Sequence, residues 1–152
     1  MSWDAHRAGQ IVAERYQLLA EIGSGGMGAV WRARDIVDGN IVALKVLHED
    51  ISDYECARER FLREAKALHS LRSPHIVQVF DSGVDAGVPF IAMELLGGET
   101  LAHRLKRTAR LTIQEVREVV GQVAEGIGAA HEIGIVHRDL KPENIFLMSG
   151  DA

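Results

Sequence analysis

The run Gly23-Ser24-Gly25-Gly26-Met27-Gly28 has residue types and a spacing that could bind phosphate. Glycine has no Cβ, so backbone N–H groups can approach phosphate oxygens closely. The G-x-G-x-x-G pattern is weak by itself, because a turn-rich hairpin that binds nothing can have the same composition. The segment that follows the loop therefore decides between the alternatives.

Two kinds of nucleotide site compete for this loop. In a dinucleotide-binding fold the loop opens a helix, and an acidic residue follows about 20 positions later. Here the segment from Ala29 to Arg34 alternates around Val30 and Trp31 and is typical of a strand. The strand favours the other alternative, a glycine-rich hairpin that lies over the phosphates of ATP.

Lys45 is a second candidate phosphate ligand, within the apolar run Ile41–Leu47. A lysine in an apolar strand is costly to bury without a partner, although an edge-strand lysine that points to solvent is the simpler alternative. Glu64 follows 19 positions later, in a helix expected over Glu55–Leu71. We expect a Lys45–Glu64 ion pair that holds the ammonium group against the α- and β-phosphates.

The segment HRDLKPEN, residues 137–144, carries the most specific resemblance in the chain. Together with the glycine loop, Ala43-Leu44-Lys45 and Glu64, in this order, it resembles the signature set of protein kinases. The loop text GSGGMGAVWRARD resembles the bacterial-type serine/threonine kinases in particular. The resemblance implies an enzyme that uses ATP and Mg²⁺ to phosphorylate a Ser or Thr hydroxyl of a protein substrate.

The same resemblance implies the catalytic roles. Asp139 would be the base or orienting carboxylate for the substrate hydroxyl, and Lys141 would offset charge near the γ-phosphate. A lysine at this position points to serine/threonine rather than tyrosine kinases. Asn144 would be a Mg²⁺ ligand, and Lys45 and Glu64 complete the expected catalytic set.

The resemblance also implies a nucleotide site. Val30, Ala43 and Phe146 would enclose the adenine ring, while the C=O of Glu94 and the N–H of Leu96 would bond its edge. The expected cofactor-binding residues are Ile22, Gly23, Gly25, Gly26, Gly28, Val30, Ala43, Lys45, Met93, Glu94, Leu96 and Phe146.

These residues require a sheet-rich first half and a helical second half, divided at Gly97-Gly98. The expected strands are Arg15–Ile22, Ala29–Arg34, Ile41–Leu47, Ile76–Phe80 and Val88–Leu95, with a turn at Gly83–Gly87 between the last two. The expected helices are Glu55–Leu71, Thr100–Arg107 and Thr112–Glu132. The third opens with Thr112-x-x-Glu115, a capping-box pattern.

The resulting fold class is α+β and protein-kinase-like. We expect a five-stranded antiparallel small lobe with one long helix, plus a truncated helical large lobe. In domain terms, residues 1–15 are an N-terminal extension, residues 16–96 the small lobe and residues 97–152 a partial large lobe that ends after the catalytic loop.

Composition and charge agree with a globular domain and restrict its partners. Hydrophobic residues make up 47% and charged residues 26%, and the net charge is -5. The excess of acidic residues argues against nucleic acid or an anionic membrane as partner. No signal peptide or membrane segment is evident, which makes the cytoplasm the expected location. The single cysteine excludes an intrachain disulfide.

The end of the sequence shapes the remaining expectations. In kinases an Asp-Phe-Gly motif, whose aspartate binds Mg²⁺, should follow Asn144 by about a dozen residues. We therefore expect a truncated and poorly active portion, whose exposed large-lobe helix could support self-association. The alternative function is a non-catalytic ATP-binding or interaction module derived from a kinase.

Overall fold

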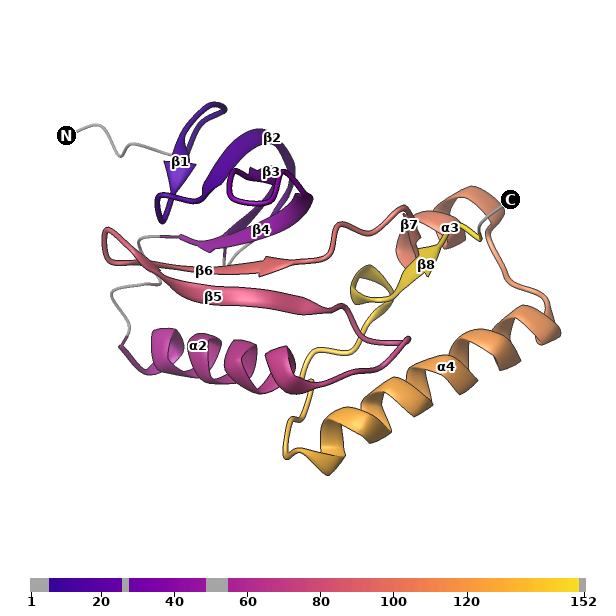
Figure 1. Ribbon diagram of the computed structural model, residues 1–152. Coiled ribbons are helices and arrows are strands. Elements are labelled where there is room, and N and C mark those ends of the chain that lie inside the picture. The colour runs from indigo at the N-terminus through magenta and orange to yellow at the C-terminus, as the bar shows by residue number, and fades with distance from the viewer. Residues whose placement is uncertain (1–5, 26–27, 49–54, 151–152) are drawn as a thin grey trace. The chain divides into compact units, whose positions relative to one another are not determined.

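Antiparallel strands make up most of the first half of the chain. The computed structural model describes residues 6–25, 28–48 and 55–150. The strands of its larger sheet are β1 (Ile11–Val12), β2 (Tyr16–Ser24), β3 (Gly28–Asp35), β4 (Ile41–Leu47), β5 (Val79–Asp85) and β6 (Val88–Met93). They are ordered β1-β2-β3-β4-β6-β5, and the sheet curls from β1 to β5 (Figure 1).

This sheet has one strand more than expected among the described residues. The additional strand is β1, in the segment that the sequence suggested was an extension, and it pairs antiparallel with β2. Val12 lies opposite Tyr16, and each of these side chains is only 1% exposed. Two backbone bonds continue the pairing, from Gly9 N to the Leu18 oxygen and from Leu18 N to the Gln10 oxygen, both 2.8 Å.

The expected strand Ile76–Phe80 was placed too early. β5 begins at Val79, because Pro74 lacks an N–H and the Ile76 N–H bonds instead to Ser73 in a turn. The strand then passes through Gly83, which pairs with Phe90, and the turn is confined to residues 86–87.

Strand alternation builds the core of this sheet. Directly opposed residues of antiparallel strands share a face, and side chains two apart on one strand do so too. One face supplies the buried core, made up of Val12, Tyr16, Leu18, Trp31, Ala33, Val42, Leu44, Val46, Val88, Phe90 and Ala92. Ala43 and Lys45 therefore point to the opposite face.

The helix after β4 is α2 (Glu55–Ser70), which packs against β5 and β6 (Figure 1). Its buried side chains are Phe61 and Ala65, one turn apart as the apolar spacing predicts. Glu64 lies beside Ala65 and is half-buried.

The chain divides into two compact units. Unit 1 contains Met1–Ser70 and Gln78–Leu95, and unit 2 contains Leu71–Val77 and Leu96–Ala152. The elements of unit 2 are β7 (Gly98–Thr100), α3 (Leu101–Thr108), α4 (Ile113–Glu132), the 3₁₀ helix η1 (Pro142–Asn144) and β8 (Phe146–Met148).

Helix α4 begins as the sequence predicts and is unevenly covered. The Thr112 hydroxyl accepts from the Glu115 N–H at 3.1 Å, and the Glu115 carboxylate accepts from the Thr112 N–H at 2.7 Å, which completes the capping box. Toward the other end, Gly126 is buried against His75. The apolar side chains of the first half, Ile113, Val116 and Val120, are exposed. Among the described helices, α4 included, none is long and apolar enough to cross a membrane.

Candidate active site

The segment between α4 and β8 brings Asp139 and Asn144 together. The Asn144 side-chain nitrogen donates to the backbone oxygen of Asp139 at 2.8 Å and lies 3.5 Å from Oδ2 of the same residue. This nitrogen closes a loop of six residues. The amide oxygen Oδ1 of Asn144 has no protein donor among the described residues, so it remains available to a ligand.

Lys141 lies beside the same carboxylate. Its Nζ is 3.3 Å from Oδ2 of Asp139, and both side chains are substantially solvent-exposed. Lys141 is the N-cap of η1 and has extended backbone, which the following residue, Pro142, favours. The three catalytic residues expected in this loop therefore form one cluster with an acid, a cation and an amide.

The backbone that presents Asp139 has an unusual conformation. Helix α4 ends where Gly134 adopts φ +81°, and Arg138, next to Asp139, has φ +67°. A left-handed conformation at a residue with a Cβ costs about 1–2 kcal/mol and is found mainly where surrounding structure enforces it. The Asp139 N–H also bonds to Nδ1 of His137 at 3.2 Å.

A two-stranded ribbon supports this loop from its C-terminal side. Strand β7 pairs with β8, with Gly98 opposite Met148 and Thr100 opposite Phe146. A Cβ on Gly98 would overlap the Leu147 carbonyl oxygen, and the residue has φ +136°, so only glycine suits this position. The ribbon thus fixes Phe146, two residues after Asn144, by backbone pairing.

In unit 1, the glycine loop is the hairpin between β2 and β3. The Gly25 N–H donates to the Gly28 oxygen at 2.9 Å, and Nε2 of His48 lies 3.0 Å from the Gly25 oxygen. Gly28 is required by packing, since a Cβ there would overlap the Val46 carbonyl oxygen. A Cβ added to Gly23 or to Gly25 would meet nothing within 4 Å, so packing does not explain why these two residues are glycines. Gly26, a fourth expected ligand, lies outside the described residues.

Lys45 lies next to the glycine hairpin in the sheet. It is opposite Val30 of β3 and Ile91 of β6, while Ala43 is opposite Met93. Val30, Ala43, Lys45 and Met93 therefore share one face of the sheet, as expected for a common ligand. Lys45 is half-buried there, and Ala43 is only 5% exposed.

The expected ion pair between Lys45 and Glu64 is not formed. Among the described residues neither side chain has an ion-pair partner within 4.0 Å. Both are partly solvated, and a pair of that kind contributes only about 0–1 kcal/mol, too little to fix the position of a helix. The two residues belong to β4 and α2 of unit 1.

The remaining expected nucleotide ligands in this part of the chain are Ile22 and the backbone groups of Glu94 and Leu96. Ile22 falls at a bulge, because Glu21 pairs with Trp31 and Gly23 with Val30, and it is 51% exposed. The Glu94 N–H bonds to the Gln78 oxygen at 2.9 Å. No donor among the described residues is bonded to the Glu94 C=O, and no acceptor there is bonded to the Leu96 N–H.

One charged cluster that the motifs did not predict surrounds Glu99. Its carboxylate accepts from Arg104 Nε and Arg107 Nη2, each at 2.6 Å, and lies 3.1 Å from His103 Nδ1. The hydrogen bonds from Arg104 and then Arg107 lower the pKa of Glu99 to about 2. Glu99 also lines a hollow of about 320 Å³ with Gly98, Arg104, Leu147, Met148 and Ser149. The spacing of Arg104 and Arg107 along α3 was the sequence signal that could have predicted this cluster.

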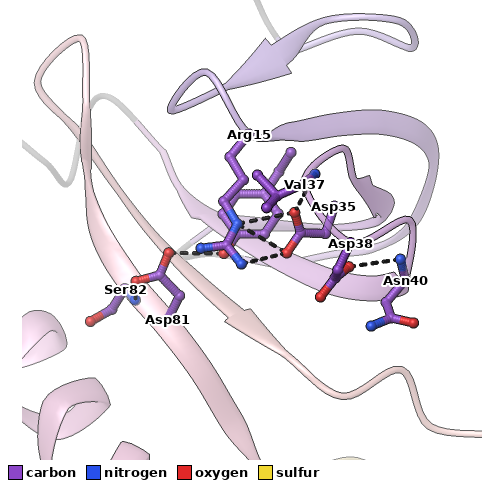
Figure 2. Close-up of polar contacts among 8 residues, drawn as sticks. Arg15, Asp35, Val37, Asp38, Asn40, Asp81 and Ser82 are labelled. Atoms are coloured by element: carbon purple, nitrogen blue, oxygen red, sulfur yellow. Dashed lines mark hydrogen bonds and ion pairs between the residues drawn. The ribbon is translucent and has the colours of Figure 1, made fainter.

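A second such cluster lies on the larger sheet (Figure 2). The Arg15 guanidinium binds Asp35 through Nε and Nη2, at 2.7–3.0 Å, and lies over the Tyr16 ring. The hydrogen bond from Arg15 lowers the pKa of Asp35, which is only 4% exposed. Burial, followed by the 2.8 Å bond to Asp81, raises the pKa of Tyr16. This cluster links β2, β3 and β5 rather than forming a reactive site.

Comparison with known proteins gives consistent similarities. A family model described as the protein kinase domain matches residues 16–152. The probable serine/threonine-protein kinase pknA2 of Bifidobacterium longum is 39% identical over 141 residues, covering 91% of this chain and 19% of its own length. The serine/threonine-protein kinase pkn3 of Myxococcus xanthus is 42% identical over 140 residues, covering 91% and 26%.

A solved structure of a kinase domain also resembles this chain. The crystal structure of the Mycobacterium tuberculosis PknI kinase domain superimposes with a TM-score of 0.88 at 33% identity. The match covers 97% of this chain and 60% of that structure. The chain thus spans about a fifth to a quarter of the length of these two curated relatives.

Proposed function

The chain belongs to the protein kinase domain family, among the serine/threonine kinases, and from this membership we propose that it acts in transferring the γ-phosphate of ATP to a protein hydroxyl. The observation that carries the proposal is the cluster of Asp139, Lys141 and Asn144, in which one carboxylate lies 3.3 Å from an ammonium group and is approached by an amide.

In this cluster Asp139 orients the Ser or Thr hydroxyl of the substrate and receives its proton. A carboxylate that is exposed to solvent can be reached by a protein substrate, and Asp139 is 67% exposed. Lys141 offsets the negative charge that develops on the transferred group, since its ammonium group is mobile enough to move from the carboxylate to a phosphoryl oxygen.

The phosphate and adenine contacts are assigned to the sheet of unit 1, which belongs to the expected small lobe at residues 16–96. Lys45 binds phosphate, supported by its position opposite Val30 beside the hairpin. Ala43 and Met93 are opposed on the same face, which suits one flat adenine ring. The C=O of Glu94 and the N–H of Leu96 are unbonded groups of the right polarity for the adenine edge.

A divalent metal suits the donors of the catalytic loop. Oδ1 of Asn144 has no protein donor among the described residues, and Oδ2 of Asp139 lies 3.5 Å from the nitrogen of the same amide. Oδ1 of Asn144 is a hard oxygen ligand of the kind that Mg²⁺ prefers. Asn144 would hold the ion, which when bound neutralises charge on the phosphates. The protein itself positions the amide, orients the hydroxyl and moves the proton to Asp139.

Calorimetry with Mg-ATP tests the nucleotide assignment. Lys45→Met should weaken binding by on the order of tenfold, because a charge-assisted contact to phosphate is lost. Lys66→Met is the matched control, since Lys66 is an exposed lysine on α2. Equal affinities of the wild-type chain and Lys45→Met would contradict the assignment.

Two finer expectations for the isolated chain stay predictions. One is that these 152 residues transfer phosphate poorly by themselves, which an assay with a generic protein substrate checks. The other is that two copies associate through the exposed half of α4, formed by Ile113, Val116 and Val120. Sedimentation of the wild-type chain and of Val120→Glu would decide this, with a lower mass expected for the variant.

A further inference from the structure

In the described part of the glycine hairpin, residues 23–25 and 28, only Ser24 has a side chain that could hold it in place. Gly23 and Gly25 contribute none, and Cβ atoms at these positions would meet open space. The hairpin base is fixed at Gly28, which lies opposite Leu47 and against the Val46 carbonyl oxygen. Gly25 lies beyond this base, so a hydrogen bond to its backbone would stabilise the hairpin.

His48 supplies that hydrogen bond. Its Nε2 lies 3.0 Å from the Gly25 carbonyl oxygen, 23 residues earlier in the chain. A carbonyl oxygen can only accept, so the ring nitrogen must donate. The Gly25 N–H already donates to the Gly28 oxygen at 2.9 Å. Both polar groups of Gly25 are therefore bonded within the protein, which holds its backbone in place.

Strand β4 places His48 where it can do this. Leu47, its neighbour, pairs with Gly28 at the end of β3, and Lys45 lies two residues before Leu47 on the same strand. Strand β4 thus carries the proposed phosphate ligand Lys45, and His48, which bonds to the hairpin, follows directly after the end of this strand. A change in the strand would shift both together.

We propose that His48 is a positioning residue for the glycine-rich hairpin, which it holds at a fixed distance from Lys45 so that ATP binds to a pre-formed loop. This inference rests on the proposed nucleotide site. Holding the loop before the ligand arrives lowers the ordering cost of binding. The effect is on ATP affinity rather than on the rate of transfer.

Affinity for Mg-ATP in a set of variants tests the role. His48→Ala should weaken binding about threefold to tenfold, as expected for one net hydrogen bond. His48→Gln should restore most of the affinity, because its amide nitrogen also donates. The matched control is His131→Ala, an exposed histidine on α4, which should bind as the wild type does. Restoration by His48→Lys but not by His48→Gln would indicate direct contact of a charge with phosphate and would overturn the positioning role.

A second measurement separates this inference from the proposed function. Hydrogen exchange without nucleotide should be several-fold faster at the Gly25 amide in His48→Ala, while the Leu44 amide in the middle of β4 is unchanged. Unchanged exchange at Gly25 would overturn the inference even if the wild type binds ATP. A wild-type chain without ATP affinity would instead count against the nucleotide site, and the exchange result would still decide whether His48 holds the loop.

Discussion

The side-chain nitrogen of Asn144 lies 2.8 Å from the backbone oxygen of Asp139. One amide therefore closes the loop from Asp139 to Asn144 with its nitrogen and leaves its oxygen for the proposed metal ion. An aspartate at position 144 has nearly the same shape but cannot donate, and it would place a second negative charge 3.5 Å or so from Oδ2 of Asp139.

This relationship predicts the effect of Asn144→Asp. The turnover number of the proposed phosphoryl transfer should fall about 10²-fold or more, because the loop opens and two carboxylates repel each other. Steady-state transfer of labelled phosphate to a protein substrate measures it. Glu143→Gln is the neighbouring control, since Glu143 is exposed and has no bond to Asp139. A change within threefold for Asn144→Asp would show that the amide nitrogen is dispensable.

The glycine hairpin predicts two different outcomes for the same substitution. Gly28→Ala should destabilise the fold by about 1–3 kcal/mol, because its Cβ would overlap the Val46 oxygen. Gly23→Ala should fold normally, since its Cβ meets nothing, but should weaken ATP binding if phosphate occupies that space. Urea unfolding and calorimetry on both variants measure the two effects. Equal stability of the two variants would contradict the packing argument.

Much of the scaffold for these residues follows from the sequence. The β2–β3 hairpin, the β4 strand, α2 and the capped start of α4 follow from alternation, helical spacing and capping, which are local properties. β1 was missed because two residues do not make a pattern, and its pairing depends on a strand that follows it. The start of β5 was misplaced because the turn after Pro74 delays the strand.

The site could be predicted in part. The motif placed Asp139, Lys141 and Asn144 in one segment, and the structure brings them within hydrogen-bonding and ion-pairing distance. A Lys45–Glu64 contact depends on where a whole helix sits, which spacing along the chain does not determine. The bond from His48 to Gly25 joins residues 23 positions apart and has no sequence signature.

The buried ion pair of Asp35 predicts a pH dependence of stability. The pKa of Asp35 is lowered in the folded state from its ordinary value of 3.8, chiefly by the hydrogen bond from Arg15. Its contribution is therefore fully present above that value and is lost as the pH falls through the lower folded value. Arg15 stays protonated throughout, because its pKa is raised.

Thermal unfolding of Asp35→Asn between pH 7 and pH 2 measures this contribution. The midpoint should be lower than in the wild type by about 5 °C at pH 7, and the difference should shrink below pH 3.8. Asp38→Asn is the matched control, because Asp38 is exposed and bonds only locally, to the Asn40 N–H at 2.8 Å. A constant difference over the whole pH range would refute the assignment to the Asp35 carboxylate.

The capping box predicts the stability of α4. Thr112→Ala removes the oxygen that accepts from the Glu115 N–H and should destabilise the helix by about 1 kcal/mol, while Thr112→Ser keeps it. Hydrogen exchange in the first two turns measures the effect. Thr108→Ala on α3 controls for the loss of a threonine, since its hydroxyl bonds only to the Arg104 carbonyl. Unaltered exchange in Thr112→Ala would show that the Thr112 hydroxyl does not stabilise the helix start.

Strand β1 has a consequence for how the domain is delimited. The family match begins at residue 16, yet Val12, at 1% exposure, belongs to the same core as Leu18. A protein shortened to the matched region would lose the backbone partners of Leu18 and open the outer edge of the sheet. The folded unit therefore starts before residue 16, where the match to the family model begins.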